Sequence, residues 1–501
     1  MDDNQIALNP NRLVRYLQKP ANTFTKEDII KFIVENEVEM LNFRYVAEDG
    51  KLKTLNFIIT DLNHLNQILS TGERVDGSSL FSFMDAGSSD LYVIPRYKTA
   101  FINPFAETLT LDLLCSFYTS EGKPLESAPE NILRKAHKKF KKDTGYTFKA
   151  LGELEYYVMA DKEDLYPAKD QKGYHTSAPF TNWEHLRTEA IKIIAECGGK
   201  IKYGHSEVGN FTKGNDFFEQ HEIEFLPTNV EDTADQLVIA KWVLRMLSNE
   251  YGVKISFAPK ITVGKAGSGL HIHMLLEKDG KNVLVKNEKL SDTAKKLIAG
   301  LLFFASPITA FGNTIPTSYL RLVPHQEAPT NICWGDRNRS VLVRVPLGWL
   351  GASDMIHDAN PQDKSELPKA SEKQTVEFRA GDGSADIYSF LSSLIVAAKY
   401  GLDNKDSLKL ANELYVDINI FDKEHENKFN NLNSLPASCY ESALSLEKYR
   451  EYFEKDGIFP SKFIDNTINK LKDFDDQHMN EEIYGNSDAI RQLVEDYLHC
   501  M

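Results

Sequence analysis

The chain has 501 residues, which is enough for a sizeable core and for two or more domains. Hydrophobic residues make up 42% and charged residues 26%, an ordinary globular composition, and the formal net charge is −15. General electrostatic binding of nucleic acid is not expected, because phosphate binding relies on basic surface and this chain is acidic.

The cysteines and the apolar stretches predict a cytoplasmic protein. The five cysteines are dispersed and include no Cys-x-x-Cys pair, so neither a disulfide framework nor a zinc knuckle is expected. The N-terminus has no basic, apolar leader. The longest apolar stretch, residues 297–311, contains Ser306 and Pro307, is too short to span a membrane, and predicts a buried helix.

The first part of the chain predicts a small α+β domain, residues 1–125, with a curved sheet. A helix begins with a cap-like start at residues 25–28. Segments 41–46 and 52–57 flank Glu48-Asp49-Gly50 and predict a hairpin, and further strands are expected at 91–94 and 108–118.

The remainder, residues 126–501, predicts a larger second domain. A helix is expected at 128–142, followed by the strand that carries Glu153 and then by alternating strands and helices. The C-terminal part is polar and charged and predicts mostly helices, for example at 442–455 and 488–498.

Glu153 and Glu155 lie two apart within the apolar run 151–158. Residues two apart on a strand point to the same face, so the two carboxylates would lie side by side. Burying two anions is costly without compensation, and a divalent cation is the simplest compensation. A solvated strand face is the alternative, because charged residues are mostly exposed.

The same spacing recurs on three later strands, and a further glutamate follows another strand. These residues are Glu222 and Glu224, His271 and His273, Glu377 and Arg379, and Glu207. Carboxylates with an imidazole suit Mg²⁺ or Mn²⁺ better than zinc. Since Mg²⁺ usually accompanies phosphate substrates, the pattern predicts phosphoryl chemistry.

Arginines support this interpretation. Arg321 lies in an apolar setting, and Arg337, Arg339 and Arg344 follow within a short run. Arginine suits bidentate binding of carboxylate and phosphate, and a solvated strand edge is the alternative for this run. The glycines around Ser268 would let a backbone loop approach a ligand closely.

Six segments resemble the motifs of type I glutamine synthetases, in the order and rough spacing of that family. They are Asp-Gly-Ser-Ser at 76–79, Gly-Glu-Leu-Glu at 152–155, Gly-Ser-Gly-Leu-His-Ile-His at 267–273, Arg-Leu-Val-Pro-His-Gln-Glu-Ala-Pro at 321–329, Asn-Arg-Ser at 338–340 and Val-Glu-Phe-Arg at 376–379. The ordered set is specific, although each motif alone is weak, and the resemblance extends from about residue 30 to about residue 470.

The resemblance implies an α+β fold with an N-terminal β-grasp domain and a C-terminal catalytic domain, whose curved antiparallel sheet is flanked by helices. It implies a homo-oligomer, a dodecamer of two stacked hexameric rings, with active sites between neighbouring subunits. Asp76 would complete a neighbour's site, bind ammonium and take its proton.

The resemblance also implies a role for each matched residue. Two divalent cations, Mg²⁺ or Mn²⁺, would be bound, one by Glu155, Glu207 and Glu222 and the other by Glu153, His271 and Glu377. His273, Arg339, Arg344 and Arg379 would contact the phosphates of ATP or the transferred phosphoryl group. The amino-acid and ammonium pocket would be formed by Arg321, the backbone of Gly267, Tyr174, Glu155 and Glu207, and closed by a flap that carries Glu327.

The implied reaction has two steps. ATP phosphorylates the γ-carboxylate of glutamate, and ammonia then attacks the acyl phosphate to give glutamine, ADP and phosphate. A γ-glutamyl ligase that uses another amine, such as a polyamine or ethanolamine, is the first alternative, and a non-catalytic relative is the second. An unrelated carboxylate-rich phosphotransferase is a further alternative.

Several positions depart from the family pattern. Ala266 replaces the usual Asn before Gly-Ser-Gly, and Glu372 and Thr375 replace two basic residues. Phe421 stands where bacterial relatives carry an adenylylated tyrosine, so no adenylylation is expected there.

Two segments also depart from the family pattern. Residues 210–218 form an apparent insertion beside the metal residues, and residues 483–501 do not match the family's C-terminal strap. The C-terminal mismatch bears on the stacking of the two rings and not on the formation of each ring.

Overall fold

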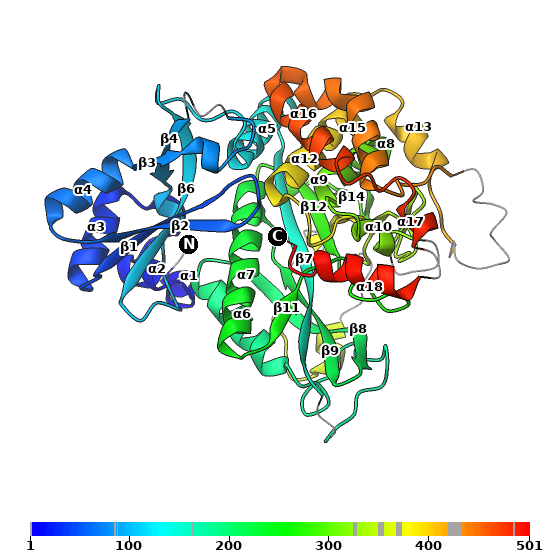
Figure 1. Ribbon diagram of the computed structural model, residues 1–501, viewed down its shortest axis with the longest axis horizontal. Coiled ribbons are helices and arrows are strands. Elements are labelled where there is room, and N and C mark those ends of the chain that lie inside the picture. Colours follow the sequence, from blue (N-terminus) through cyan, green and yellow to red (C-terminus); the bar gives the residue numbers. More distant parts are fainter. Residues whose placement is uncertain are drawn as a thin grey trace.

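The structure, a computed structural model, describes residues 3–84, 87, 89–162, 165–323, 328–348, 355–366, 373–418, 432–483 and 486–500. Two β-sheets, joined by a long helix that lies between them, organise these residues (Figure 1). This arrangement confirms the predicted α+β class.

The N-terminal sheet has the strand order β2-β1-β6-β4-β3, with β5 beside β6. Its elements are α1 (Asp3–Ala7), α2 (Arg12–Leu17), α3 (Lys26–Glu35), β1 (Met40–Val46), β2 (Leu52–Ile58), α4 (Leu62–Thr71), β3 (Glu73–Asp76), β4 (Asp90–Pro95), β5 (Phe101–Ile102) and β6 (Thr110–Thr119). The predicted hairpin is confirmed, because β1 pairs with β2 along its whole length. The predicted helix start is confirmed by a capping box between Thr25 and Asp28.

The C-terminal sheet has the strand order β16-β17-β18-β12-β7-β9-β8. Its strands are β7 (Thr147–Asp161), β8 (Ile201–Lys213), β9 (Asp216–Phe225), β10 (Thr228–Asn229), β11 (Lys254–Ser256), β12 (Leu270–Lys278), β13 (Lys281–Asn282), β16 (Trp334–Asp336), β17 (Val343–Val345) and β18 (Val376–Phe378); β14 (Val285–Lys286) and β15 (Lys289–Leu290) form a separate hairpin. All neighbours along this sheet are antiparallel except β16 and β17.

Helices flank this sheet and form most of the C-terminal part. They are α5 (Pro129–Thr144), α6 (Glu184–Glu196), α7 (Val230–Glu250), α8 (Asp292–Phe303), α9 (Ala305–Gly312), α10 (Ser318–Arg321), α11 (Met355–Ala359), α12 (Ile387–Asp403), α13 (Ser407–Glu413), α15 (Cys439–Glu454), α16 (Ser461–Lys472), α17 (Met479–Glu482) and α18 (Ser487–Asp496). The predicted helices at 128–142, 442–455 and 488–498 are therefore confirmed.

The prediction of a single buried helix over 297–311 is wrong in one respect. The segment is buried, but it is divided between α8 and α9, which are bent by 72°. Pro307 explains the break, because proline lacks an N–H and its ring crowds the carbonyl of Phe303. No single helix among the described residues is long and apolar enough to cross a membrane, although this bent pair reaches the required length and composition.

Helix α7 connects the two sheets and fixes the central strand of the second one. Leu237 of α7 packs so closely on β7 that a Cβ added at Gly152 would lie 2.8 Å from its Cδ2 atom. On the other side, Asp235 of α7 accepts two hydrogen bonds from Arg96 at 2.7 and 2.9 Å. A side chain in place of Gly152 would displace Leu237, and α7 holds β7 relative to the N-terminal sheet.

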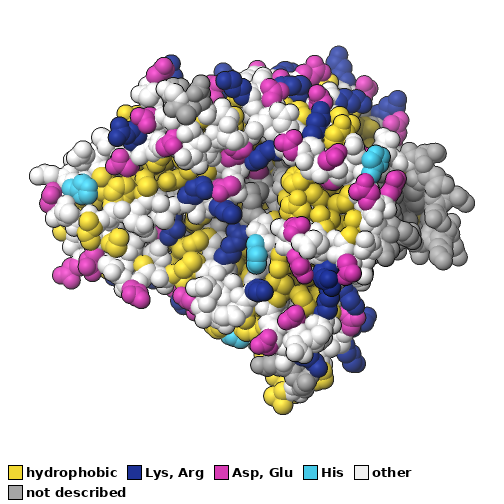
Figure 2. Space-filling model, viewed as in Figure 1, with side chains coloured by type: hydrophobic (Ala, Val, Ile, Leu, Met, Phe, Trp, Pro, Cys, Tyr) yellow, Lys and Arg dark blue, Asp and Glu magenta, His cyan; other side chains and the backbone are white. Residues whose placement is uncertain are grey.

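The junction between the two sheets is basic in an otherwise acidic protein. Basic side chains gather near the centre of the face in Figure 2, where α7 and the chain end lie in Figure 1. A cavity of about 420 Å³ at this junction is lined by residues that include Lys51, Lys241, Arg245 and Lys254.

We propose that the chain is divided into two domains, residues 1–125 and residues 126–501.

Candidate active site

Strand pairing brings the predicted residues together on one face of the C-terminal sheet. β7 lies between β12 and β9, so Glu153 is opposite His271 on one side and Glu224 on the other. Glu155 is opposite Glu222 in the same way. These side chains are buried or nearly so. The alternative of a solvated strand face is therefore wrong for Glu153 and Glu155.

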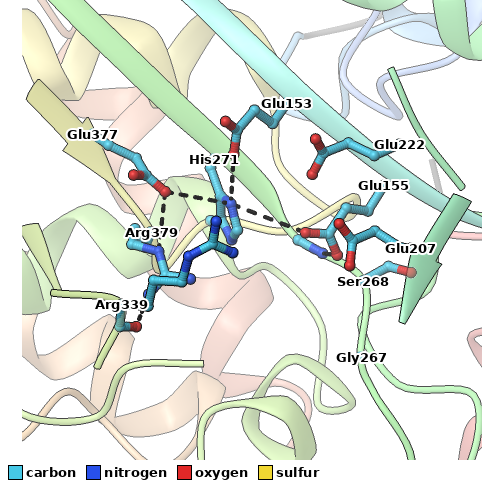
Figure 3. Close-up of polar contacts among 12 residues, drawn as sticks. Glu153, Glu155, Glu207, Glu222, Gly267, Ser268, His271, Arg339, Glu377 and Arg379 are labelled. Carbon is cyan, nitrogen blue, oxygen red and sulfur yellow. Dashed lines mark hydrogen bonds and ion pairs between the residues drawn. The ribbon is translucent and has the colours of Figure 1, made fainter. Parts of the chain in front are cut away.

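The first group of possible metal ligands consists of Glu153, His271 and Glu377. One ligand atom from each lies within 4.8 Å of the others. His271 Nδ1 is 2.9 Å from a Glu153 oxygen and 3.7 Å from a Glu377 oxygen (Figure 3). Burial tends to raise the pKa of Glu153, but His273 and His271 outweigh it and hold this pKa well below its usual value. The carboxylate is thus kept ionised and ready for a cation.

The second group differs from the predicted set. His205, Glu207 and Glu222 place ligand atoms within 4.8 Å of one another, and His205 Nε2 is 3.2 Å from a Glu222 oxygen. Glu155 lies beside Glu207 and Glu222, on the opposite side of His271 from Glu377 (Figure 3). His205 was missed by the sequence analysis, although its two-residue spacing from Glu207 is the signal used for the other pairs.

Charge crowding in the second group is visible in its pKa values. Burial raises the pKa of Glu155 to about 7, and Glu207 adds to this effect while His271 opposes it. Burial, Glu153, Glu155 and Glu207 together raise the pKa of Glu222 well above its usual value. A divalent cation would relieve this repulsion, and oxygen ligands with one imidazole suit Mg²⁺ or Mn²⁺.

Glu224 extends the first group. Its Oε1 atom pairs with Lys202 at 2.6 Å, whereas its buried Oε2 atom has no hydrogen-bond partner among the described residues. A ligand atom of Glu224 lies within 4.8 Å of ligand atoms of Glu153 and His273. His273 also contacts Thr375, whose hydroxyl is 2.9 Å from Nδ1 and helps to orient the ring. The substitution at Thr375 therefore replaces a basic residue with one that positions a histidine.

Two of the predicted phosphate-binding arginines flank Glu377. Arg344 Nη1 is 3.0 Å from one Glu377 oxygen, and Arg379 Nε is 3.0 Å from the other. Arg379 also donates to the carbonyl of Arg339. Arg339 is exposed, and a hydrogen bond with Tyr174 raises its pKa against the opposing effect of burial. The three predicted arginines thus lie along one side of the carboxylate groups.

Arg321 lies against the backbone that follows β18 and beside the Gly-Ser-Gly loop. The Nη1 atom of Arg321 donates to the Ala380 carbonyl at 2.9 Å, and a Cβ at Gly269 would lie 2.6 Å from Nη2. Gly269 N–H donates to Glu155 at 2.8 Å. Gln220, which sequence reasoning missed, donates to the Gly267 carbonyl at 3.0 Å and to Glu155 at 3.2 Å. Its two-residue spacing from Glu222 was the available signal.

Tyr174 lies beside the second group. Its half-exposed ring stacks on His175 at 4.2 Å between centroids, and both rings contact His205. Through His205, this aromatic cluster in the loop that precedes α6 contacts the second group. Tyr174 therefore lies next to both Arg339 and the second candidate metal group.

Asp76 lies at the end of β3, in the N-terminal sheet. Its carboxylate accepts hydrogen bonds from the hydroxyls of Ser78, Ser79 and Ser89 at 2.7, 2.7 and 2.8 Å. These hydrogen bonds, led by that from Ser79, lower the pKa of this exposed carboxylate, which is therefore ionised. Within the described parts of the chain, no contact joins Asp76 to the carboxylate groups.

The remaining sequence predictions have mixed outcomes. Glu327, Glu372 and Phe421 lie outside the described residues. The apparent insertion at 210–218 is the outer part of the β8–β9 hairpin, where Phe211 stacks on Phe218 at 4.5 Å. Ala266 is buried, and its N–H donates to the Gln171 side chain at 2.8 Å.

Comparisons with known proteins agree with this geometry. Residues 126–484 match the family model described as glutamine synthetase, catalytic domain, and residues 37–120 match glutamine synthetase, beta-grasp domain. A glutamine synthetase of Clostridium saccharobutylicum is 32% identical over 441 residues, which cover 86% of this chain and 91% of that protein. One of Methanococcus maripaludis is 29% identical over 434 residues, covering 84% and 90%.

Solved structures show the same fold. The glutamine synthetase of Plasmodium falciparum superposes with a TM-score of 0.74 at 20% identity, covering 93% of this chain and 99% of that chain. A complex of GmaS with ADP gives a TM-score of 0.71 at 18% identity, covering 92% and 99%. The predicted β-grasp and catalytic domain folds are confirmed.

The raised pKa of Glu155 gives a test of the charge crowding. Since this pKa is about 7 in the folded protein and near its ordinary value of 4.5 when unfolded, the associated stability is complete below pH 4.5 and is lost as the pH rises through about 7. Without divalent cations, the melting temperature of the wild type should therefore fall between about pH 5.5 and about pH 8. Glu155→Gln should flatten this fall.

Added MgCl₂ at the higher pH should raise the melting temperature of the wild type more than that of Glu155→Gln, because the amide binds the cation less well. Differential scanning fluorimetry with EDTA or MgCl₂ measures both effects. Glu121→Gln, an exposed glutamate distant from the site, is the matched control. An unchanged pH slope and an equal Mg²⁺ response in Glu155→Gln would contradict the crowding.

Proposed function

Because the chain belongs to the glutamine synthetase family and is a ligase, we propose that it joins ammonium to the γ-carboxylate of L-glutamate with ATP, giving L-glutamine, ADP and phosphate. The observation that carries this proposal is the meeting of two carboxylate–imidazole groups and the flanking arginines on one sheet face. The donor sets fit two divalent cations, Mg²⁺ or Mn²⁺.

We propose that Glu153, His271 and Glu377 hold one cation. Glu155, Glu207 and Glu222 hold the other, with His205 as a further ligand. When bound, the cations supply Lewis-acid stabilisation of charge on the phosphoryl oxygens. Their binding also removes the mutual repulsion among these carboxylates.

We propose that the arginines bind charged groups of both substrates, ATP and glutamate. Arg339, Arg344 and Arg379 neutralise negative charge on the transferred phosphoryl group, and His273 contacts the phosphates of ATP. Arg321 holds the α-carboxylate of glutamate, while the Gly267 backbone meets its amino group. The γ-carboxylate oxygen is thereby directed toward the phosphoryl group.

In the second step, the nitrogen of ammonia forms a bond to the carbonyl carbon of the γ-glutamyl phosphate, and the bond from that carbon to the phosphate oxygen breaks. We propose that Asp76 of a neighbouring subunit binds ammonium and takes its proton, beside Tyr174, Glu155 and Glu207. Three serine hydroxyls donate to the Asp76 carboxylate and hold it in place at the end of β3. Glu327 would lie on the flap that excludes water.

This arrangement requires a ring of subunits, and we propose a dodecamer of two stacked hexamers. We also propose a cytoplasmic location. The five cysteines are free and four of them are buried, which suits a reducing compartment.

The reaction is tested with ATP, MgCl₂ and glutamate, together with ammonium, methylamine, ethanolamine or putrescine. We expect phosphate release to depend on ammonium and to match glutamine formation by mass spectrometry. Ala266, which lacks the amide of the family's Asn, is the observation that favours the second candidate, a γ-glutamyl ligase for another amine. Product formation only with an organic amine would contradict ammonium as the substrate and support that candidate.

Complementation between subunits tests the role of Asp76. Asp76→Asn and Glu377→Gln should each lower kcat by about 100-fold or more, because each removes a group from the reacting centre. Mixed rings reassembled from the two variants should recover activity, since about a quarter of the interfaces combine an intact Asp76 with an intact catalytic sheet. Inactive mixed rings, with mixing verified by two affinity tags, would contradict a shared site.

A further inference from the structure

The last described residues, α18 and 497–500, lie beyond residue 484, where the match to the family ends. In Figure 1, α18 lies beside α10, and the chain end lies next to α7 and β7. This C-terminal tail, defined as residues 487–500, therefore returns to the catalytic half of its own chain. Its contacts extend by two routes toward the residues proposed to bind the amino-acid substrate, Arg321 and Gly267.

The first contact is made by α18. Val494 is buried against Leu320 and Met479, and Leu493 packs on the same small cluster. Leu320 directly precedes Arg321, the residue proposed to hold the α-carboxylate. The tail therefore packs behind the arginine at one end of the amino-acid site.

The second contact is made by the residues after α18. Leu498 and Cys500 pack against a cluster that contains Tyr157, Ala258 and Ile261. The hydroxyl of Tyr157 donates to the Ala266 carbonyl at 2.8 Å. Through Tyr157, the tail is thus connected to the residue just before Gly267.

Hydrogen bonds form a second connection to the same loop. The Ser256 hydroxyl donates to the Leu498 carbonyl and accepts from the Ala258 N–H at 3.1 Å. The carbonyl of Pro259, the residue after Ala258, accepts a hydrogen bond from the Ser268 N–H at 3.1 Å. The path from the tail to the Gly-Ser-Gly loop is therefore short and continuous.

Arg245 fastens the end of the tail. Its Nη2 atom donates to the Cys500 carbonyl at 2.7 Å, and its guanidinium lies 5.1 Å from the centre of the Phe257 ring. Phe257 immediately precedes Ala258, so Arg245 touches both the tail and the start of the loop. This contact holds the tail next to the start of the loop.

We propose that the C-terminal tail positions the amino-acid side of the active site, namely the loop 258–269 and Arg321, and so sets the affinity for the amino-acid substrate. The inference rests on the proposed function. The loop 258–269 has no helix or strand among its residues, so its position depends on packing. The phosphate side is different, because His273 and Arg344 lie on strands that the sheet itself holds.

Substitutions within the full-length chain test this role. Val494→Ala and Leu498→Ala remove the two packing contacts, and together they should raise KM for glutamate about tenfold, because a small displacement weakens an oriented site strongly. KM for ATP and kcat at saturating glutamate should stay within about twofold of wild type, since the phosphate side keeps its supports. Leu498→Met, which conserves the packing, should retain the wild-type KM.

Glu495→Ala is the matched control, because Glu495 is exposed on the same helix between the two contacts. It should leave KM for both substrates unchanged. An unchanged KM for glutamate in the double variant would overturn the proposal. So would a parallel rise of both KM values with a lower melting temperature, since that pattern indicates general loss of structure.

Hydrogen–deuterium exchange gives a readout that needs no turnover. The amides of Ala258 and Ser268 should exchange faster in the double variant, while those in the centre of β12 should not change. Unchanged exchange at both amides would overturn the positioning role whatever the substrate is. Absence of ammonium-dependent turnover in the wild type would instead overturn the proposed function and leave the exchange result interpretable.

Discussion

Repulsion among buried carboxylates is the constraint on which the catalytic half of the protein depends. β7 places Glu153 and Glu155 on one face, β9 places Glu222 and Glu224 opposite them, and β18 adds Glu377. Burying so many anions is unfavourable unless cations or hydrogen-bond donors compensate. The neighbouring histidines, arginines and loop amides are therefore part of the same electrostatic arrangement, and divalent cations complete it.

This compensation is uneven. Around Glu153 and Glu377, two histidines and two arginines are close enough to keep the carboxyl pKa values low. Around Glu222 the neighbouring charges are carboxylates, which add to burial and raise its pKa. At Glu155, burial and Glu207 outweigh His271 and Arg321, and its pKa is raised as well. The carboxylates of the first group are kept ionised by the protein's own positive charges. In the second group, a bound cation would relieve more of the electrostatic repulsion.

The sequence predicted the local parts of this site and not their assembly. The two-residue spacing of Glu153 and Glu155 predicts a shared face, because alternation is a property of a single strand. It does not say that β7 lies between β12 and β9, since strand order depends on pairing between distant segments. His205 was missed for a related reason, because its place beside Glu222 depends on the β8–β9 register, which shifts after Ser206. The bend at Pro307 and the return of the tail are likewise tertiary outcomes.

The most direct test of this account is anomalous scattering from crystals grown with MnCl₂. The account predicts two Mn²⁺ ions per subunit on the β7 face. One is bound by Glu153, His271 and Glu377, and the other by Glu155, Glu207 and Glu222 with His205 as a further ligand. Anomalous peaks at both places would support the view that these carboxylates are buried together in order to hold cations. Crystals with no Mn²⁺ between these strands, at saturating MnCl₂ and about pH 8, would contradict it.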